Sequence, residues 1–174
     1  AVAWNSANGL TVTASNNIIV SNTITNSGGG SITLNANVAA NGSITINNNI
    51  STGGSITTLS NGDTTIAASA TLTTGTTGSL NLQAAGGSIA GAGNLSINGN
   101  LAMGTGTLTL LSGINGTRPS LTLNGTNFSL LGANIGVTSI TGFQDVTLAR
   151  NLPVNGAMTI NPQRDFTLTA AQTF

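Results

Sequence analysis

The stretch GSITLNANVAANGSITINNNISTGGSITTLS, at residues 30–60, indicates the fold of this chain. Polar and apolar residues alternate in it. Thr33 and Asn35 would lie on one face of an extended strand, and Ile32 and Leu34 on the other. A strand this short cannot bury its apolar face alone. The stretch therefore predicts that copies of one unit stack on each other.

Looser copies of this stretch recur along the whole chain. One group of predicted strands opens, at nearly constant spacing, at Ser31, Ser55, Ser79 and Thr107. A second group alternates with the first, and its trailing apolar residues are Ile24, Ile50, Leu72 and Leu101. Two interleaved groups with a period of about 25 residues indicate coils of at least two strands. The chain has room for about seven such coils.

The period separates the candidate repeat folds. Helical repeats are excluded, because no apolar spacing of 3.6 residues occurs and Gly, Asn, Ser and Thr dominate. We therefore predict an all-β parallel β-solenoid, or β-helix, whose coils pair through in-register ladders. About seven coils at about 4.8 Å each would form a rod of about 34 Å. At the corners, Asn47, Asn48 and Asn49 are expected to hydrogen-bond along the rod, with Asn98 and Asn100 in the analogous place.

The regularity of the pattern changes along the chain. We predict one solenoid segment over residues 1–174, with regular coils at 1–111 and less regular coils at 112–174. Residues 112–142 are either a less regular stretch of the same solenoid or a loop insertion that forms a contact surface. The segment is expected to be part of a longer chain or filament.

Composition excludes several classes of function. Only 3% of the residues are charged, with a formal net charge of zero, so the basic patch required for nucleic-acid binding is missing. No Cys is present, which excludes disulfides and thiolate metal sites. The apolar runs are too short for a transmembrane helix. The N-terminus lacks the features of a signal peptide, so we expect that the signal was removed or that this is a piece of something longer.

Catalytic chemistry is not predicted either. The chain has three Asp and no Glu, His or Lys, and the Asp residues are far apart in sequence. A hydrolase or lyase needs such groups to converge on one groove. Asp145 with Arg150, and Arg164 with Asp165, are expected to form surface ion pairs, and NGD at 61–63 a turn. We predict no enzyme activity, no cofactor and no metal site.

Three segments, NNIIV (16–20), NGSITINNNISTGGSITTLSNG (41–62) and GNLSINGNLAMGTGTLTL (93–110), resemble a known family. They are similar to the repeat regions of two-partner-secreted, filamentous-haemagglutinin-like adhesins of Gram-negative bacteria. The resemblance implies a right-handed parallel β-helix, secretion through a dedicated outer-membrane transporter, and attachment to host or neighbouring cells from the bacterial surface. The Asn-Pro-Asn-Gly signature of that family's secretion domain is missing, since Asn161-Pro162 is followed by Gln163. The resemblance therefore implies that this piece is a stalk or is shorter than its parent protein.

The candidate functional surface is the outward polar face of the strands. Its predicted residues are Thr33, Thr45, Thr57, Thr109 and Thr122. As an adhesin stalk, the chain would have as partners other segments of the same chain and host or bacterial surface glycans or proteins. Two alternatives stay open: a subunit that stacks end to end into an extracellular filament, because both termini look strand-like and uncapped, and an ice-binding solenoid that uses the outward Thr and Ser side chains.

Overall fold

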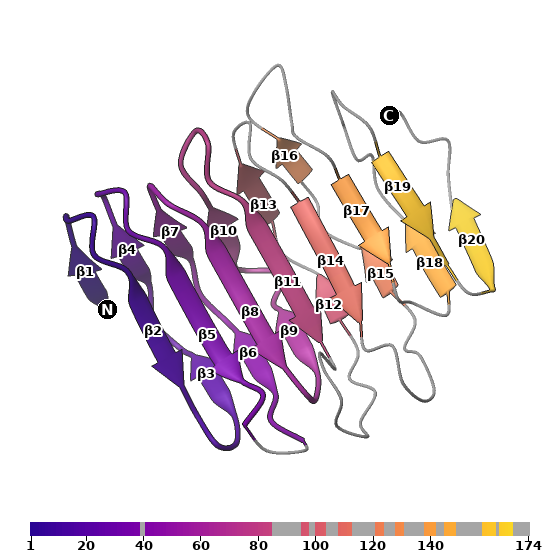
Figure 1. Cartoon of the computed structure of the whole chain (residues 1–174), viewed down its shortest axis with the longest axis horizontal. Helices are drawn as coiled ribbons and strands as arrows, with labels where there is room; N and C mark the ends of the chain where they lie inside the picture. Colours follow the sequence, from indigo (N-terminus) through magenta and orange to yellow (C-terminus); the bar gives the residue numbers. More distant parts are fainter. Residues whose placement is uncertain are drawn as a thin grey trace.

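Parallel strands form three sheets in the computed structural model of this chain, and no strand runs antiparallel to its neighbour in the part that the structure describes. The structure describes residues 1–38, 41–84, 95–97, 100–103, 108–112, 121–123, 128–130, 138–141, 145–148, 158–162 and 164–168. Figure 1 shows the strands side by side, from β1 at the N-terminal end to β20 at the other.

Each sheet contains every third strand along most of the chain. Sheet A consists of β1 (Val2–Trp4), β4 (Ile24–Asn26), β7 (Ile50–Thr52), β10 (Thr71–Thr73), β13 (Asn100–Met103) and β16 (Phe128–Leu130). Sheet B consists of β2 (Leu10–Thr13), β5 (Ile32–Ala36), β8 (Ile56–Ser60), β11 (Leu80–Ala84), β14 (Leu108–Ser112), β17 (Thr138–Thr141) and β19 (Met158–Asn161). Sheet C consists of β3 (Ile18–Val20), β6 (Ile44–Ile46), β9 (Thr64–Ile66), β12 (Leu95–Ile97), β15 (Leu121–Leu123), β18 (Asp145–Leu148) and β20 (Asp165–Leu168).

The predicted all-β parallel solenoid with stacked coils is confirmed. The sequence pattern indicated two groups of strands, whereas the structure has three sheets. Segments that the sequence pattern assigned to one group contain two strands. Residues 43–52, for example, hold β6 and β7, and these strands are separated by a bend at 47–49. The chain therefore passes through sheets A, B and C in turn, which gives three strands per coil.

Alternate side chains of strands β3 to β10 face the interior of the solenoid. In β5, Ile32 and Leu34 are fully buried, whereas Thr33 between them is half-buried on the outside. Ile44 and Thr45 of β6 show the same alternation. The inward and outward faces predicted from these stretches are confirmed.

The predicted trailing apolar residues form one continuous column inside the rod. Ile50 pairs with Ile24 on one side and with Leu72 on the other, and Leu72 pairs with Leu101. All four side chains are buried. Fully burying such a side chain stabilises the folded state by about 1.5–3 kcal/mol, so in-register stacking is the main source of core energy.

Serine residues at the corner between sheets A and B join the coils through hydrogen bonds. Ser31, Ser55 and Ser79 each stand immediately before a strand of sheet B. The backbone N–H of Ser55 donates to Ser31 Oγ at 3.1 Å, and the N–H of Ser79 donates to Ser55 Oγ at 3.0 Å. The serine repeat seen in the sequence is therefore a ladder of side-chain acceptors for the next coil.

The other two corners use the same arrangement with different residues. Before sheet C, the N–H of Ser43 donates to Asn17 Oδ1 at 3.0 Å, and the N–H of Asp63 donates to Ser43 Oγ at 3.1 Å. Before sheet A, the N–H of Thr71 donates to Asn49 Oδ1 at 2.9 Å. A short polar side chain ahead of each strand thus satisfies a backbone donor of the following coil.

The side chains of Asn48 and Asn49 do bond along the rod, as predicted, although their partners there are not other asparagines. Asn48 Oδ1 accepts from Thr23 Oγ1 at 3.1 Å, in addition to the contact of Asn49 with Thr71. Asn98 and the side chain of Asn100 lie outside the described residues.

One buried hydroxyl in the core has no hydrogen-bond partner. Thr58 of β8 is fully buried, its ladder neighbours are Leu34 and Leu82, and its Oγ1 is unsatisfied. We expect Thr58→Val to raise the free energy of unfolding by about 1–2 kcal/mol, because valine has nearly the same shape and no polar atom to desolvate. Urea unfolding followed by circular dichroism measures the change.

The matched control is Thr64→Val in β9. Thr64 is also fully buried, but its Oγ1 lies 2.8 Å from Ser60 Oγ and donates to the carbonyl of Gln83 at 3.2 Å. Removing that hydroxyl breaks both of its buried hydrogen bonds, although Ser60 Oγ and the Gln83 carbonyl keep each other as partners at 3.3 Å, so we expect the free energy of unfolding to fall by about 1 kcal/mol. If the free energy of unfolding changed in the same direction in both variants, the Thr58 hydroxyl would not be the unsatisfied group described here.

Candidate functional surface

The five threonines of the predicted polar face lie on two different sheets. Thr33, Thr57 and Thr109 occupy one register row of sheet B, in which Asn81 stands between the last two. Thr45 and Thr122 occupy a row of sheet C. The residues of the outward polar face predicted from the sequence are therefore divided between two faces of the solenoid.

Stacking covers much of each outward side chain. Thr33, Thr45 and Thr57 are half-buried, because the coil on either side presents a side chain at the same register position. For Thr109 and Thr122 the structure describes the ladder positions and not the side chains. The face offers the tips of closely spaced side chains rather than separate projecting groups.

A second outward row runs along sheet B with a mixed composition. Thr13, Asn35, Leu59 and Gln83 follow one another in register. Of β2, β5, β8 and β11, only β2 has threonine in both rows, which differs from the paired T-x-T rows of solenoid ice-binding proteins. Neither row of these four strands contains a charged residue, so contacts with this face would use hydroxyl, amide and methyl groups.

Two acidic residues in the described part of the chain meet at a position that the sequence did not predict. Asp145 and Asp165 are neighbours in the ladder of β18 and β20. Arg164 Nε lies 3.4 Å from Asp165 Oδ2, and both side chains are mostly exposed. The predicted surface ion pair of these two residues is confirmed, and it contributes little to stability. Arg150, the predicted partner of Asp145, lies outside the described residues.

The remaining predictions about charged and loop residues can be located as follows. Residues 61–63, the NGD stretch, lie between β8 and β9 in a bend. β15, β16 and β17 fall within 112–142, as does Ser112 at the end of β14, and the rest of that range lies outside the described residues, Arg118 included. No group of three His, Cys, Asp or Glu residues that could hold a metal ion occurs among the described residues. The described part of the chain also contains no helix with the length and hydropathy of a membrane span.

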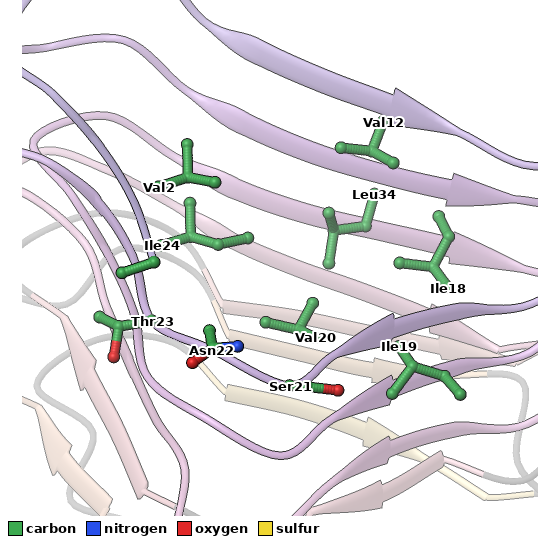
Figure 2. A pocket seen from close by; sticks show the side chains of 11 residues that line it. Val2, Val12, Ile18, Ile19, Val20, Ser21, Asn22, Thr23, Ile24 and Leu34 are labelled. Carbon is green, nitrogen blue, oxygen red and sulfur yellow. The ribbon is translucent and has the colours of Figure 1, made fainter.

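A cavity of about 360 Å³ opens at the N-terminal end of the solenoid. It is lined mainly by apolar side chains of the first two coils: Val2, Val12, Ile18, Val20, Ile24 and Leu34. Figure 2 shows these side chains around one shared space, between strands of all three sheets. The sequence indicated an uncapped end but not this cavity.

Together these features define a repeat protein of the parallel β-solenoid class, with uncharged, hydroxyl- and amide-rich faces over strands β2 to β11. No protein-family model matches the chain, and no curated protein or solved structure shows significant similarity to it.

Proposed function

We propose that the chain is an extracellular structural rod, the stalk region of a secreted bacterial surface adhesin of the filamentous-haemagglutinin-like kind. The observation that carries this proposal is the continuity of the stack. Three parallel ladders of six, seven and seven strands run along the same direction, and side-chain hydrogen bonds join successive coils at all three corners. Such a stack transmits force along its axis without a hinge in the described coils.

The finer architecture is part of the proposal: a right-handed β-helix of about seven coils of roughly 25 residues. The register supports the coil length, because Ile56 pairs with Ile32 and Leu80, its counterparts in the preceding and the following coil. Right-handedness is the expected sense, since connections between parallel strands of one sheet are right-handed in about 98% of cases.

A stalk role also agrees with the chemistry of the surface. The described outward rows of sheets A, B and C consist mostly of Thr, Ser, Asn and Ala, with Ile19, Leu59 and Gln83 among the exceptions, and this composition suits a passive spacer. Attachment to glycans or proteins of host or neighbouring cells is then the task of the adhesin as a whole. We propose no catalytic role and no cofactor for this segment.

Two measurements on the native protein test the proposal. We expect protease treatment of intact cells to release peptides of this chain, and the intact mass of the released or secreted protein to be far above that of 174 residues. A cytoplasmic protein of the same cells is the control and should stay uncut. A native mass equal to that of these 174 residues, together with full protection in intact cells, would overturn the proposal.

A further inference from the structure

We propose that Asn41 is a site of spontaneous covalent modification in the folded protein. Its side-chain amide is lost by reaction with the backbone of Gly42, which converts Asn41 to aspartate or isoaspartate. The equivalent residue of the next coil, Asn61, is held by its neighbours and keeps its amide. The inference goes beyond the proposed stalk function and does not depend on it, because it concerns the local chemistry of two corners.

Two Asn-Gly dipeptides stand at the same corner of successive coils. Asn41-Gly42 lies between β5 of sheet B and β6 of sheet C, and Asn61-Gly62 lies between β8 and β9 of the same two sheets. The N–H of Gly62 donates to the carbonyl oxygen of Gly42 at 2.8 Å, so the two dipeptides are stacked directly on each other. The two asparagines therefore share their position in the coil and the glycine that follows, and they differ in their surroundings.

Asn61 is fixed on all sides. It is only 3% exposed, and its Nδ2 donates to the carbonyl oxygen of Asn37 in the preceding coil at 2.6 Å. The N–H of Gly62, the group that would attack the side chain, is occupied by its hydrogen bond to Gly42. Only residues 61–63 join β8 to β9, so the chain has little freedom at this corner.

Asn41 is exposed instead, because the connection in its coil is longer. Residues 37–43 join β5 to β6. Among the described residues, neither the side chain of Asn41 nor the N–H of Gly42 has a hydrogen-bond partner. The side-chain amide and the backbone nitrogen that can attack it are therefore both available to react.

The reaction needs only these two residues and water. The Gly42 nitrogen forms a bond to Asn41 Cγ, the C–N bond of the side-chain amide breaks, and ammonia leaves with the proton from the Gly42 nitrogen. Water then opens the resulting five-membered succinimide ring at one of its two carbonyls, which gives aspartate or isoaspartate without any transfer of electrons. Proximity favours the ring closure, and glycine has no Cβ to shield the attacking nitrogen.

The product changes a part of the chain that is almost free of charge. Asp63 has the only charged side chain within residues 1–117, and its N–H donates to Ser43 Oγ at 3.1 Å, in the same pair of corners. A carboxylate at residue 41 adds a second negative charge there, and isoaspartate also adds a methylene to the main chain. Gly42 packs closely against the backbone of Ala36, so this corner has little room for the extra atom.

Amide loss at single residues in the chain of 174 residues tests the proposal. The folded protein is incubated at mildly alkaline pH, and peptide mapping by mass spectrometry follows each asparagine, while an isoaspartyl methyltransferase labels isoaspartate. We expect Asn41 to lose its amide at least about ten times faster than Asn61, because Asn61 reacts only when its corner opens. In concentrated urea the two rates should agree within about twofold, since glycine follows both residues.

The matched control is Asn41→Gln, which keeps a side-chain amide and would have to close a larger ring. The peptide that contains residue 41 should keep its amide in this variant over the same period. The proposal is overturned if Asn61 reacts as fast as Asn41 in the folded chain, if the Asn41 amide persists in the folded chain while it is lost in urea, or if the glutamine variant loses its amide at the same rate as the parent.

Discussion

Ile56→Asp is expected to lower the free energy of unfolding by about 4 kcal/mol or more. Ile56 is fully buried in β8, between Ile32 and Leu80 of the neighbouring coils. The substitution removes a packed side chain, which costs about 2–5 kcal/mol, and adds a carboxylate that no cation in this column can pair with. A buried carboxyl gains a proton more readily than one in the unfolded chain, so its folded-state pKa is raised. The loss should therefore be smallest below about pH 4 and larger at pH 7.

The neighbouring variant Thr57→Asp is the matched control. It places the same charge one residue further on, at a half-buried outward position between Thr33 and Asn81. We expect its free energy of unfolding to stay within about 1 kcal/mol of the parent. Circular dichroism during urea unfolding follows the whole solenoid, and the fluorescence of Trp4, the single tryptophan, follows the first coil. Equal losses in both variants would show that the inward and outward faces are assigned wrongly.

Inward and outward positions could be predicted from the sequence because they depend on strand alternation alone. The two-residue period of a strand was enough to place Ile32 and Leu34 inside and Thr33 outside. In the structure the first two are fully buried and Thr33 is half-buried. The column of Ile24, Ile50, Leu72 and Leu101 was recognisable for a related reason: equivalent residues of successive coils must match in register to share a core.

The third sheet could not be predicted, because three-residue strands show too little alternation to be told apart from a bend. Three consecutive polar residues, Asn47 to Asn49, are compatible with a corner. The strands on either side of them, β6 and β7, are so short that the sequence pattern assigned both to one group. Once that corner is placed, Thr45 belongs to sheet C and Thr57 to sheet B. The residues of the predicted outward polar face are therefore divided between these two sheets.

The pairing of residues between coils also could not be predicted where the number of residues per coil changes. In sheet C, Thr64 pairs with Ile44 of the preceding coil and with Leu95 of the following coil, and the second step along the chain is much longer than the first. No single repeat period predicts both the pairing of Thr64 with Ile44 and its pairing with Leu95. The ladder contact of Asp145 with Asp165 is another short step, which is why two acidic residues that are separate in sequence meet in the fold.

The repeated Gly-Ser dipeptide is the part of the opening stretch whose meaning depends most on the structure. At the corner between sheets A and B it occurs at 30–31, 54–55 and 78–79, and it also occurs at 42–43, ahead of β6 in sheet C. The serine accepts the N–H of the next coil, as described above. The glycine permits the backbones of adjacent coils to approach closely.

Gly30→Ala is therefore expected to lower the free energy of unfolding by about 3 kcal/mol. A Cβ at Gly30 would overlap the backbone carbonyl of Asn8 in the preceding coil. The Gly30 carbonyl also accepts hydrogen bonds from Asn26 Nδ2, at 3.0 Å, and from Thr52 Oγ1. Moving the backbone away from Asn8 would break these buried hydrogen bonds. The overlap therefore cannot be relieved without a loss of folding free energy.

Gly29→Ala, one residue earlier, separates this clash from the general effect of replacing glycine. A Cβ at Gly29 meets no atom within 4 Å. We expect the free energy of unfolding to be unchanged or to rise by up to about 1 kcal/mol, because alanine restricts the unfolded chain. Thermal and urea unfolding of the two variants, with amide hydrogen exchange at residues 8–12, measure the difference. A loss at Gly30 no larger than at Gly29 would mean that the coils are not in contact at this corner, and the stacked Gly-Ser positions would then need another explanation.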